Sequence, residues 1–138
     1  MNDPLPRPVT LVLDTSAVAA FGEQSVHVGE VLVQVHEDHA VAAIPVACLV
    51  EASRIVPGWD LLELLLRHDD TILLAEDGSN WREVAKALPF VGDYASAVCA
   101  QAAADHGAAL LTKVPGRYEH LEEEPGDFIL EIHPDLPD

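Results

Sequence analysis

The sequence predicts a three-layer α/β/α domain with a mainly parallel sheet of four or five strands. Short apolar runs alternate along the chain with segments of helical periodicity, an order typical of a parallel sheet with helices on both faces. Of the 138 residues, 49% are hydrophobic, which suits one domain with a single core. We expect that domain to cover residues 1–138, with a loose arm at 1–8 and a tail at 133–138.

Five short apolar runs are predicted to be strands. The first, Val-Thr-Leu-Val-Leu, is almost continuously apolar and β-branched, as in strands that helices cover on both faces. The expected strands are residues 9–13, 41–44, 71–74, 108–112 and 128–132.

The segments between these runs carry helix start and stop signals. Ser25 and Asp93 are N-cap candidates, Pro45 suits a first helical turn, and Gly107 suits a C-terminal cap. Pro89 is expected to end the helix before it. The expected helices are a short one ending near Phe21, then 26–38, 46–55, 60–68, 80–87, and one from Asp93 to Gly107. The acidic tract 119–126 is predicted to be a loop or a short helix.

Composition limits the function and the compartment. Asp and Glu number 24 against seven Lys and Arg, a formal net charge of −17, which argues against a protein that wraps duplex DNA but leaves room for a basic partner protein. The start MNDPLPRP has no apolar core of a secretory signal, and no run approaches the ~20 apolar residues of a membrane span. Cys48 and Cys99 lie in apolar segments and suit buried thiols. We expect a soluble, cytoplasmic protein with no membrane partner.

Three carboxylates are candidates for a site at the carboxyl edge of the sheet, where open α/β sheets bind ligands. Asp14 directly follows the first strand, and Asp93 opens an alanine-rich helix. Each also suits a helix N-cap. Glu51 lies in an apolar helix and either pairs with Arg54 on an exposed stripe or is buried near a cation. Carboxylates gathered at one point favour a hard cation such as Mg²⁺.

Four segments together resemble a PIN domain, and the chain length resembles that of VapC-type toxins of toxin–antitoxin pairs. They are Leu11-Val12-Leu13-Asp14-Thr15-Ser16-Ala17, Glu51 in its apolar helix, Gly92-Asp93-Tyr94-Ala95, and Ala109-Leu110-Leu111-Thr112. The resemblance implies a ribonuclease dependent on Mg²⁺ or Mn²⁺, an RNA substrate, a cognate antitoxin and a homodimer. It implies direct metal ligation by Asp14 and Asp93 and a metal-bound water held by Glu51. Ser16 and Thr112 are either supporting hydroxyls or simply a helix cap and a strand end.

The sequence departs from that family after Thr112. The family carries an acid two residues later, where this chain has Val114, and Lys113 adds a positive charge. Three consequences are open: one metal held by the remaining acids, partial replacement of the metal by Lys113, or a binding module without catalysis. Arg54, Lys113 and Arg117 all fall near the expected site, which suits either anion binding or a self-neutralised site.

Other sites and functions were weighed against this one. His36 and His39 have a spacing that can hold a transition metal, but they sit in a polar helix end that suits a solvated surface. The helices 26–38 and 60–68 are candidate surfaces for a non-catalytic interaction module. A haloacid-dehalogenase-like phosphatase needs Asp-x-Asp, and this chain has Asp14-Thr15-Ser16. A phosphoryl-accepting receiver needs an early acidic pair, and only Asp3 precedes Asp14.

Overall fold

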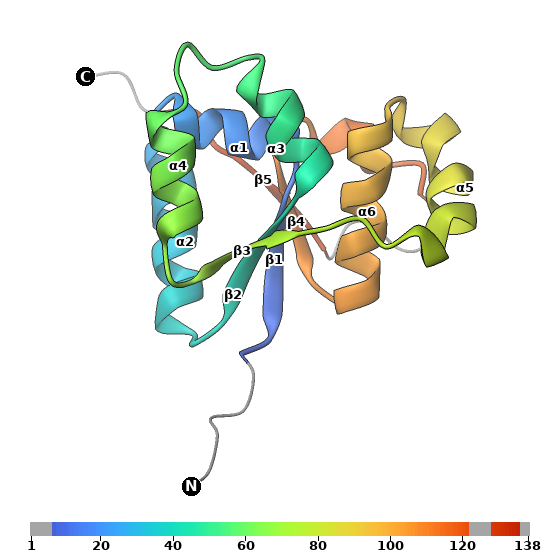
Figure 1. The fold of residues 1–138 in the computed structure, drawn as a ribbon, viewed down its shortest axis with the longest axis horizontal. Helices are drawn as coiled ribbons and strands as arrows, with labels where there is room; N and C mark the ends of the chain where they lie inside the picture. Colours follow the sequence, from blue (N-terminus) through green and yellow to red (C-terminus); the bar gives the residue numbers. More distant parts are fainter. Residues whose placement is uncertain (1–6, 122–127, 136–138) are drawn as a thin grey trace, which may run out of the picture.

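The structure is a computed structural model that describes residues 7–121 and 128–135. Within them, a five-stranded sheet with all pairs parallel has the order β3-β2-β1-β4-β5 (Figure 1). The strands are β1 Val9–Leu13, β2 Val41–Pro45, β3 Thr71–Leu74, β4 Ala109–Thr112 and β5 Ile129–Glu131. The predicted α/β class and parallel sheet are confirmed, and every strand lies within one residue of its expected bounds.

Helices cover both faces of the sheet, which confirms the three-layer architecture (Figure 1). Successive residues of β1 point to opposite faces: Leu11 and Leu13 belong to one buried cluster and Val12 to the other. The first cluster takes side chains from α1, α2 and α4, and the second takes them from α5 and α6. The helices are α1 Thr15–Gly22, α2 Val26–Glu37, α3 Val46–Ser53, α4 Asp60–Arg67, α5 Trp81–Val91 and α6 Tyr94–His106. Short 3₁₀ turns cover Gly78–Asn80 and Pro115–Tyr118.

Small side chains bring α6 close to the sheet. Its buried face consists of alanines together with Ser96 and Cys99, and it packs on β1, β2 and β4. Cys99 and Cys48 are both free and buried, as predicted, and burial first and then Cys48 raise the pKa of the Cys99 thiol. The close approach of α6 carries its first residues to the carboxyl end of the central strands.

The predicted end of α5 at Pro89 is wrong. The helix continues through Pro89 to Val91 and ends at Gly92, whose φ of 91° is in the left-handed region that glycine adopts readily. Pro89 has no backbone N–H, so the helix lacks one hydrogen bond there. Because Pro89 lies in the last turn, only a short part of the helix follows this missing hydrogen bond. Val91 is buried in the second hydrophobic cluster, and this packing offsets the loss. Two shorter corrections are that α3 ends at Ser53 rather than 55 and α5 begins at Trp81.

Several expected features fall partly outside the described residues. These are positions 1–6 of the arm, 122–127 of the acidic tract and 136–138 of the tail. Of the arm, Arg7 donates hydrogen bonds to the Asp70 carboxylate and to the Asp69 carbonyl at the amino end of β3. In the described part of the chain, none of the helices is both long enough and apolar enough to span a bilayer.

Candidate active site at the carboxyl edge of the sheet

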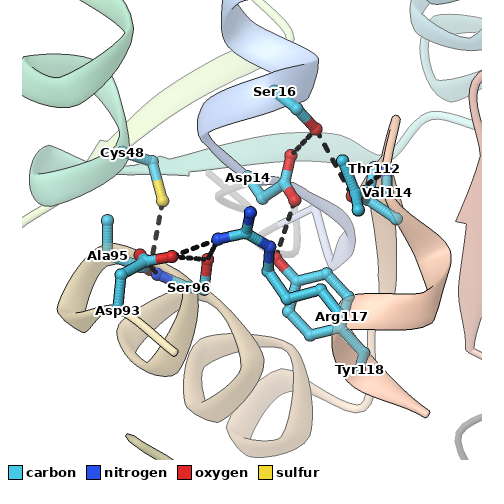
Figure 2. Close-up of polar contacts among 10 residues, drawn as sticks. All are labelled: Asp14, Ser16, Cys48, Asp93, Ala95, Ser96, Thr112, Val114, Arg117 and Tyr118. Atoms are coloured by element: carbon cyan, nitrogen blue, oxygen red, sulfur yellow. Dashed lines mark hydrogen bonds and ion pairs between the residues drawn. The ribbon is translucent and has the colours of Figure 1, made fainter. Parts of the chain in front are cut away.

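Asp14 sits at the carboxyl end of the central strand. Its backbone N–H donates to the Leu111 carbonyl of β4 at 3.3 Å, so the residue continues β1 alongside β4. Figure 2 shows its carboxylate between Ser16 and Tyr118. Because all strand pairs are parallel, the carboxyl ends of β2, β1 and β4 share this edge. The predicted placement of Asp14 at the carboxyl edge is confirmed.

The Asp14 carboxylate is buried, with 3% of the residue exposed, and accepts three hydrogen bonds. Its Oδ1 accepts from the Ala17 backbone N–H at 2.9 Å and from Ser16 Oγ at 2.6 Å, while Oδ2 accepts from the Tyr118 phenol at 2.7 Å. The Ala17 contact is the expected N-cap of α1. Each carboxylate oxygen can accept about two hydrogen bonds, so Oδ2 keeps one acceptor position.

Asp93 caps α6 and faces Arg117. Its Oδ1 accepts from the Ser96 backbone N–H at 2.8 Å, and its Oδ2 accepts from Ser96 Oγ at 2.9 Å and from the Arg117 guanidinium (Figure 2). The left-handed turn at Gly92 ends α5 and turns the chain so that Asp93 can start α6. The Asp93 side chain is 44% exposed, and its Oδ1 keeps one acceptor position.

Arg117 and Tyr118, consecutive residues of the turn Pro115–Tyr118, bind the two carboxylates. Arg117, which pairs with Asp93, also donates to Ser96 Oγ at 3.2 Å. The next residue, Tyr118, is fully buried and donates to Asp14. Burial first, and then the Asp14 carboxylate, raise the pKa of the Tyr118 phenol, while the nearby Ser96 opposes the rise. Two acids far apart in sequence are therefore bonded to consecutive residues of one turn, which forms a polar network with them.

Ser16 and Thr112 close the edge between α1 and β4. Their hydroxyl oxygens lie 3.3 Å apart. The Lys113 backbone N–H donates to Ser16 Oγ at 2.8 Å, and the Val114 backbone N–H donates to Thr112 Oγ1 at 3.0 Å. Both hydroxyls thus hold the chain after β4 in place. Lys113 reaches this edge through its backbone, and the residue itself is exposed.

A cavity of about 700 Å³ gathers the acids at this edge. Its lining includes four acidic residues and one basic residue: Asp14, Glu51, Glu76, Asp93 and Arg117. Val114, at the position where an acid was expected, also lines it. Glu51 and Arg54 form the expected pair at 2.9 Å, and the Glu51 side chain is 48% exposed, so the exposed-stripe interpretation of Glu51 holds.

The donor set of this cavity suits a hard cation. Asp14 and Asp93 offer one free acceptor position each, and carboxylate oxygens with added waters are the ligands that Mg²⁺ prefers. Across residues 7–121 and 128–135, no group of three His, Cys, Asp or Glu side chains already has the spacing of a metal centre. Asp14 and Asp93 would therefore hold a cation together with water, and Glu51 would act from the cavity wall.

The second candidate metal site, at His36 and His39, has a different arrangement. His36 Nδ1 lies 2.6 Å from the Asp70 carboxylate, and Arg7 pairs with the same carboxylate. His39 follows the end of α2 with a φ of 54°. Asp70 precedes β3, so this ion cluster lies at the amino edge of the sheet, opposite the cavity.

Sequence reasoning missed four residues of the cavity and its network. Ser96 stands three residues after Asp93, the spacing of an N-cap hydrogen bond, and this signal could have found it. Glu76 and Tyr94 form a hydrogen bond of 2.6 Å at the cavity, and Tyr118 donates to Asp14. Nothing in their local sequence signals these contacts, because each joins segments that only the fold brings together.

Comparisons with known proteins add no identification to this geometry. The sequence matches no protein-family model and shows no significant match to a curated protein.

Proposed function

We propose that this protein is a metal-dependent ribonuclease of the PIN type, the toxin of a toxin–antitoxin pair. One observation carries the proposal: Asp14 and Asp93, from separate halves of the chain, line one cavity at the carboxyl edge of a parallel sheet. The resemblance of the segments around Asp14, Glu51, Asp93 and Thr112 to PIN domains supports it. The cavity is large enough for part of a nucleotide chain, and its acids suit Mg²⁺ or Mn²⁺.

Each residue at the cavity has a role in this proposal. Asp14 and Asp93 hold the cation, which when bound supplies an activated water and stabilises charge on the phosphate. Glu51, at the cavity wall, orients water. Ser16 and Thr112 keep the chain after β4 against α1, which fixes the direction of the Asp14 carboxylate. Val114 contributes no ligand, so we expect weak metal affinity and slow turnover.

The remaining expectations complete the proposal. We propose RNA as the substrate, a cognate antitoxin as the protein partner, a homodimer as the assembly, and the cytoplasm as the compartment. The net charge of −17 supports a basic partner protein. It also requires that RNA be held locally, by cations at the cavity, rather than along a basic face.

One feature favours a second function, a PIN-like interaction module without catalysis. Apolar side chains surround the acids of the cavity, and three aliphatic ones are strongly exposed: Val50 at 53%, Ile55 at 57% and Val114 at 43%. Exposed apolar residues beside a polar cavity suit a bound polypeptide. In this case the cavity would hold a partner segment and no reaction would occur.

Metal binding and RNA cleavage separate these functions. We would titrate Mn²⁺ into the wild type, Asp14→Asn, Asp93→Asn and the control Asp60→Asn by calorimetry, since Asp60 is exposed on α4. The same proteins would be incubated with hairpin and single-stranded RNAs. The nuclease proposal requires binding and cleavage that both site variants lose and the control keeps.

The opposite result is equally clear. Cleavage that survives in Asp14→Asn or Asp93→Asn would refute the assignment. No binding at millimolar Mn²⁺ and no cleavage would favour the interaction module. Thermal melts of each variant show whether the fold survives, which Asn, itself a good N-cap residue, should allow.

A further inference from the structure

Arg117 is the cation that neutralises Asp93. Its guanidinium contacts Asp93 Oδ2 and lies 3.2 Å from Ser96 Oγ (Figure 2). Within the described residues, the other ion pair at the cavity, between Arg54 and Glu51, is more exposed and lies at the carboxyl end of α3. Arg117 therefore occupies Oδ2 of the carboxylate whose other oxygen, Oδ1, keeps a position for an incoming cation.

The Arg117 side chain can leave Asp93 without a change in the backbone. The next residue, Tyr118, is fully buried and bonded to Asp14, so the 3₁₀ turn Pro115–Tyr118 is anchored. The Arg117 side chain is 38% exposed and extends from that turn into the cavity. A rotation about side-chain bonds is enough to move the guanidinium.

The charges at the cavity determine the position of the Arg117 guanidinium. Four carboxylates and one guanidinium line the cavity, so Arg117 lowers the repulsion among the acids. A divalent cation on Asp93 would replace that neutralisation and would repel the guanidinium beside it. A displaced guanidinium pairs well with an anion that presents two oxygens to its donor fork, as the non-bridging oxygens of a phosphodiester do.

We propose that Arg117 alternates between Asp93 and the phosphodiester of the bound RNA. In the resting protein Arg117 neutralises Asp93 and so lowers the affinity for the metal. Once the metal is bound to Asp93, the Arg117 guanidinium binds a non-bridging phosphate oxygen. This inference rests on the proposed function and makes metal and RNA binding mutually favourable. It assigns substrate binding to Arg117 and not to Lys113, which meets the site through its backbone.

Arg117→Gln tests the exchange, because it should change the two affinities in opposite directions. Mn²⁺ affinity, measured by calorimetry, should rise about threefold to fivefold, as expected when a half-exposed ion pair is removed. Affinity for a single-stranded oligodeoxynucleotide in the presence of Mn²⁺, measured by fluorescence anisotropy, should fall about tenfold. The salt dependence of that affinity should weaken by about 0.7 in log–log slope, the value for one phosphate contact.

Arg82→Gln is the matched control. Arg82 stacks on Trp81 of α5, with its guanidinium carbon 5.4 Å from the ring centroid, and it lies outside the cavity lining. The substitution removes the same charge, so it reports how much of each change comes from net charge alone. We expect both affinities in this variant to stay within about twofold of the wild type.

Two results overturn the inference. The first is that Arg117→Gln binds Mn²⁺ no more tightly than Arg82→Gln does. This result includes the case in which neither variant binds Mn²⁺. The other is unchanged oligonucleotide affinity in Arg117→Gln. RNA cleavage that depends on Asp14, with neither affinity shifted, would leave the proposed function standing and remove this exchange. The opposite shifts without any cleavage would support the exchange and remove the nuclease.

Discussion

Tyr118→Phe removes one hydroxyl from the buried end of the polar network. The phenol donates to Asp14 Oδ2 at 2.7 Å, and both residues are buried, with 3% of Asp14 exposed. Without the hydroxyl, Oδ2 loses its protein donor, and water can replace it only from the side of the cavity. The two hydrogen bonds to Oδ1, from Ala17 and Ser16, remain.

The size of the effect follows from these contacts. A hydrogen bond to a charged group contributes about 1.5–3 kcal/mol, and the lost partner leaves a buried oxygen unsatisfied. We therefore expect the free energy of unfolding to fall by about 2 kcal/mol. For a chain of this length that corresponds to a melting temperature lower by about 6 °C.

Urea denaturation measured by circular dichroism tests this value, and the chain contains its own control. It has two tyrosines, and Tyr94 donates to Glu76 on the exposed rim of the cavity at 2.6 Å. Tyr94→Phe should lower the free energy of unfolding by no more than about 0.5 kcal/mol. Equal losses in the two variants would refute the role given to the buried phenol.

The pH dependence gives a second readout of the same contact. Burial raises the pKa of Tyr118 in the folded protein, so its contribution to stability is complete below the unfolded pKa of about 10. It is lost as the pH rises toward the folded value, because only the unfolded state then releases the proton. The advantage of the wild type over Tyr118→Phe should shrink by up to about 1.4 kcal/mol per pH unit above pH ~10. An advantage that is constant up to pH ~11.5 would contradict this account.

Two further variants probe the ends of the sheet. Val114→Asp adds a carboxylate to the cavity lining and should tighten Mn²⁺ binding in calorimetry. The control Val33→Asp, on the exposed face of α2, should leave Mn²⁺ affinity unchanged. Equal affinities in the two variants would argue against a metal site. At the amino edge, burial raises the pKa of Asp70, but hydrogen bonds and charges from Arg7 and His36 outweigh it and the net pKa is lowered. The ionised Asp70 carboxylate therefore stabilises the fold above the unfolded pKa of about 3.9, and this stabilisation is lost as the pH falls through the folded pKa. Urea midpoints between pH ~5 and ~3 should fall more steeply in the wild type than in Asp70→Asn. Parallel curves for the two proteins would contradict this role of Asp70.

Most of the fold could be predicted because the signals are local. The central strands β1, β2 and β4 are short apolar runs that are mostly buried on both sides, as a parallel sheet with helices on both faces requires. Ser25, Asp93 and Gly107 cap their helices as expected. Pro89 misled the prediction because its cost depends on position, and in a last turn packed through Val91 the cost is small.

The site could be predicted only in part. Asp14 and Asp93 follow from chain position, since strand ends and helix starts meet at one edge of a parallel sheet. The exposure of Glu51 does not follow from its sequence, because one apolar helix can turn either stripe outward. Tyr118 was missed because its partner is the distant Asp14, and a buried tyrosine in a polar turn carries no periodic signal.

The two capping acids differ in how the fold depends on them, and this difference shapes how the chain tolerates variation. Asp14 is buried and joins β1, α1 and Tyr118. A random substitution of Asp14 therefore lowers the amount of folded protein as well as any activity. Asp93 has a half-exposed side chain, and loss of its cap is milder. In a library selected only for expression, Asp14 should persist while Asp93 drifts. If Asp93 is retained under selection for function, this is therefore better evidence of chemistry at the carboxyl edge than retention of Asp14.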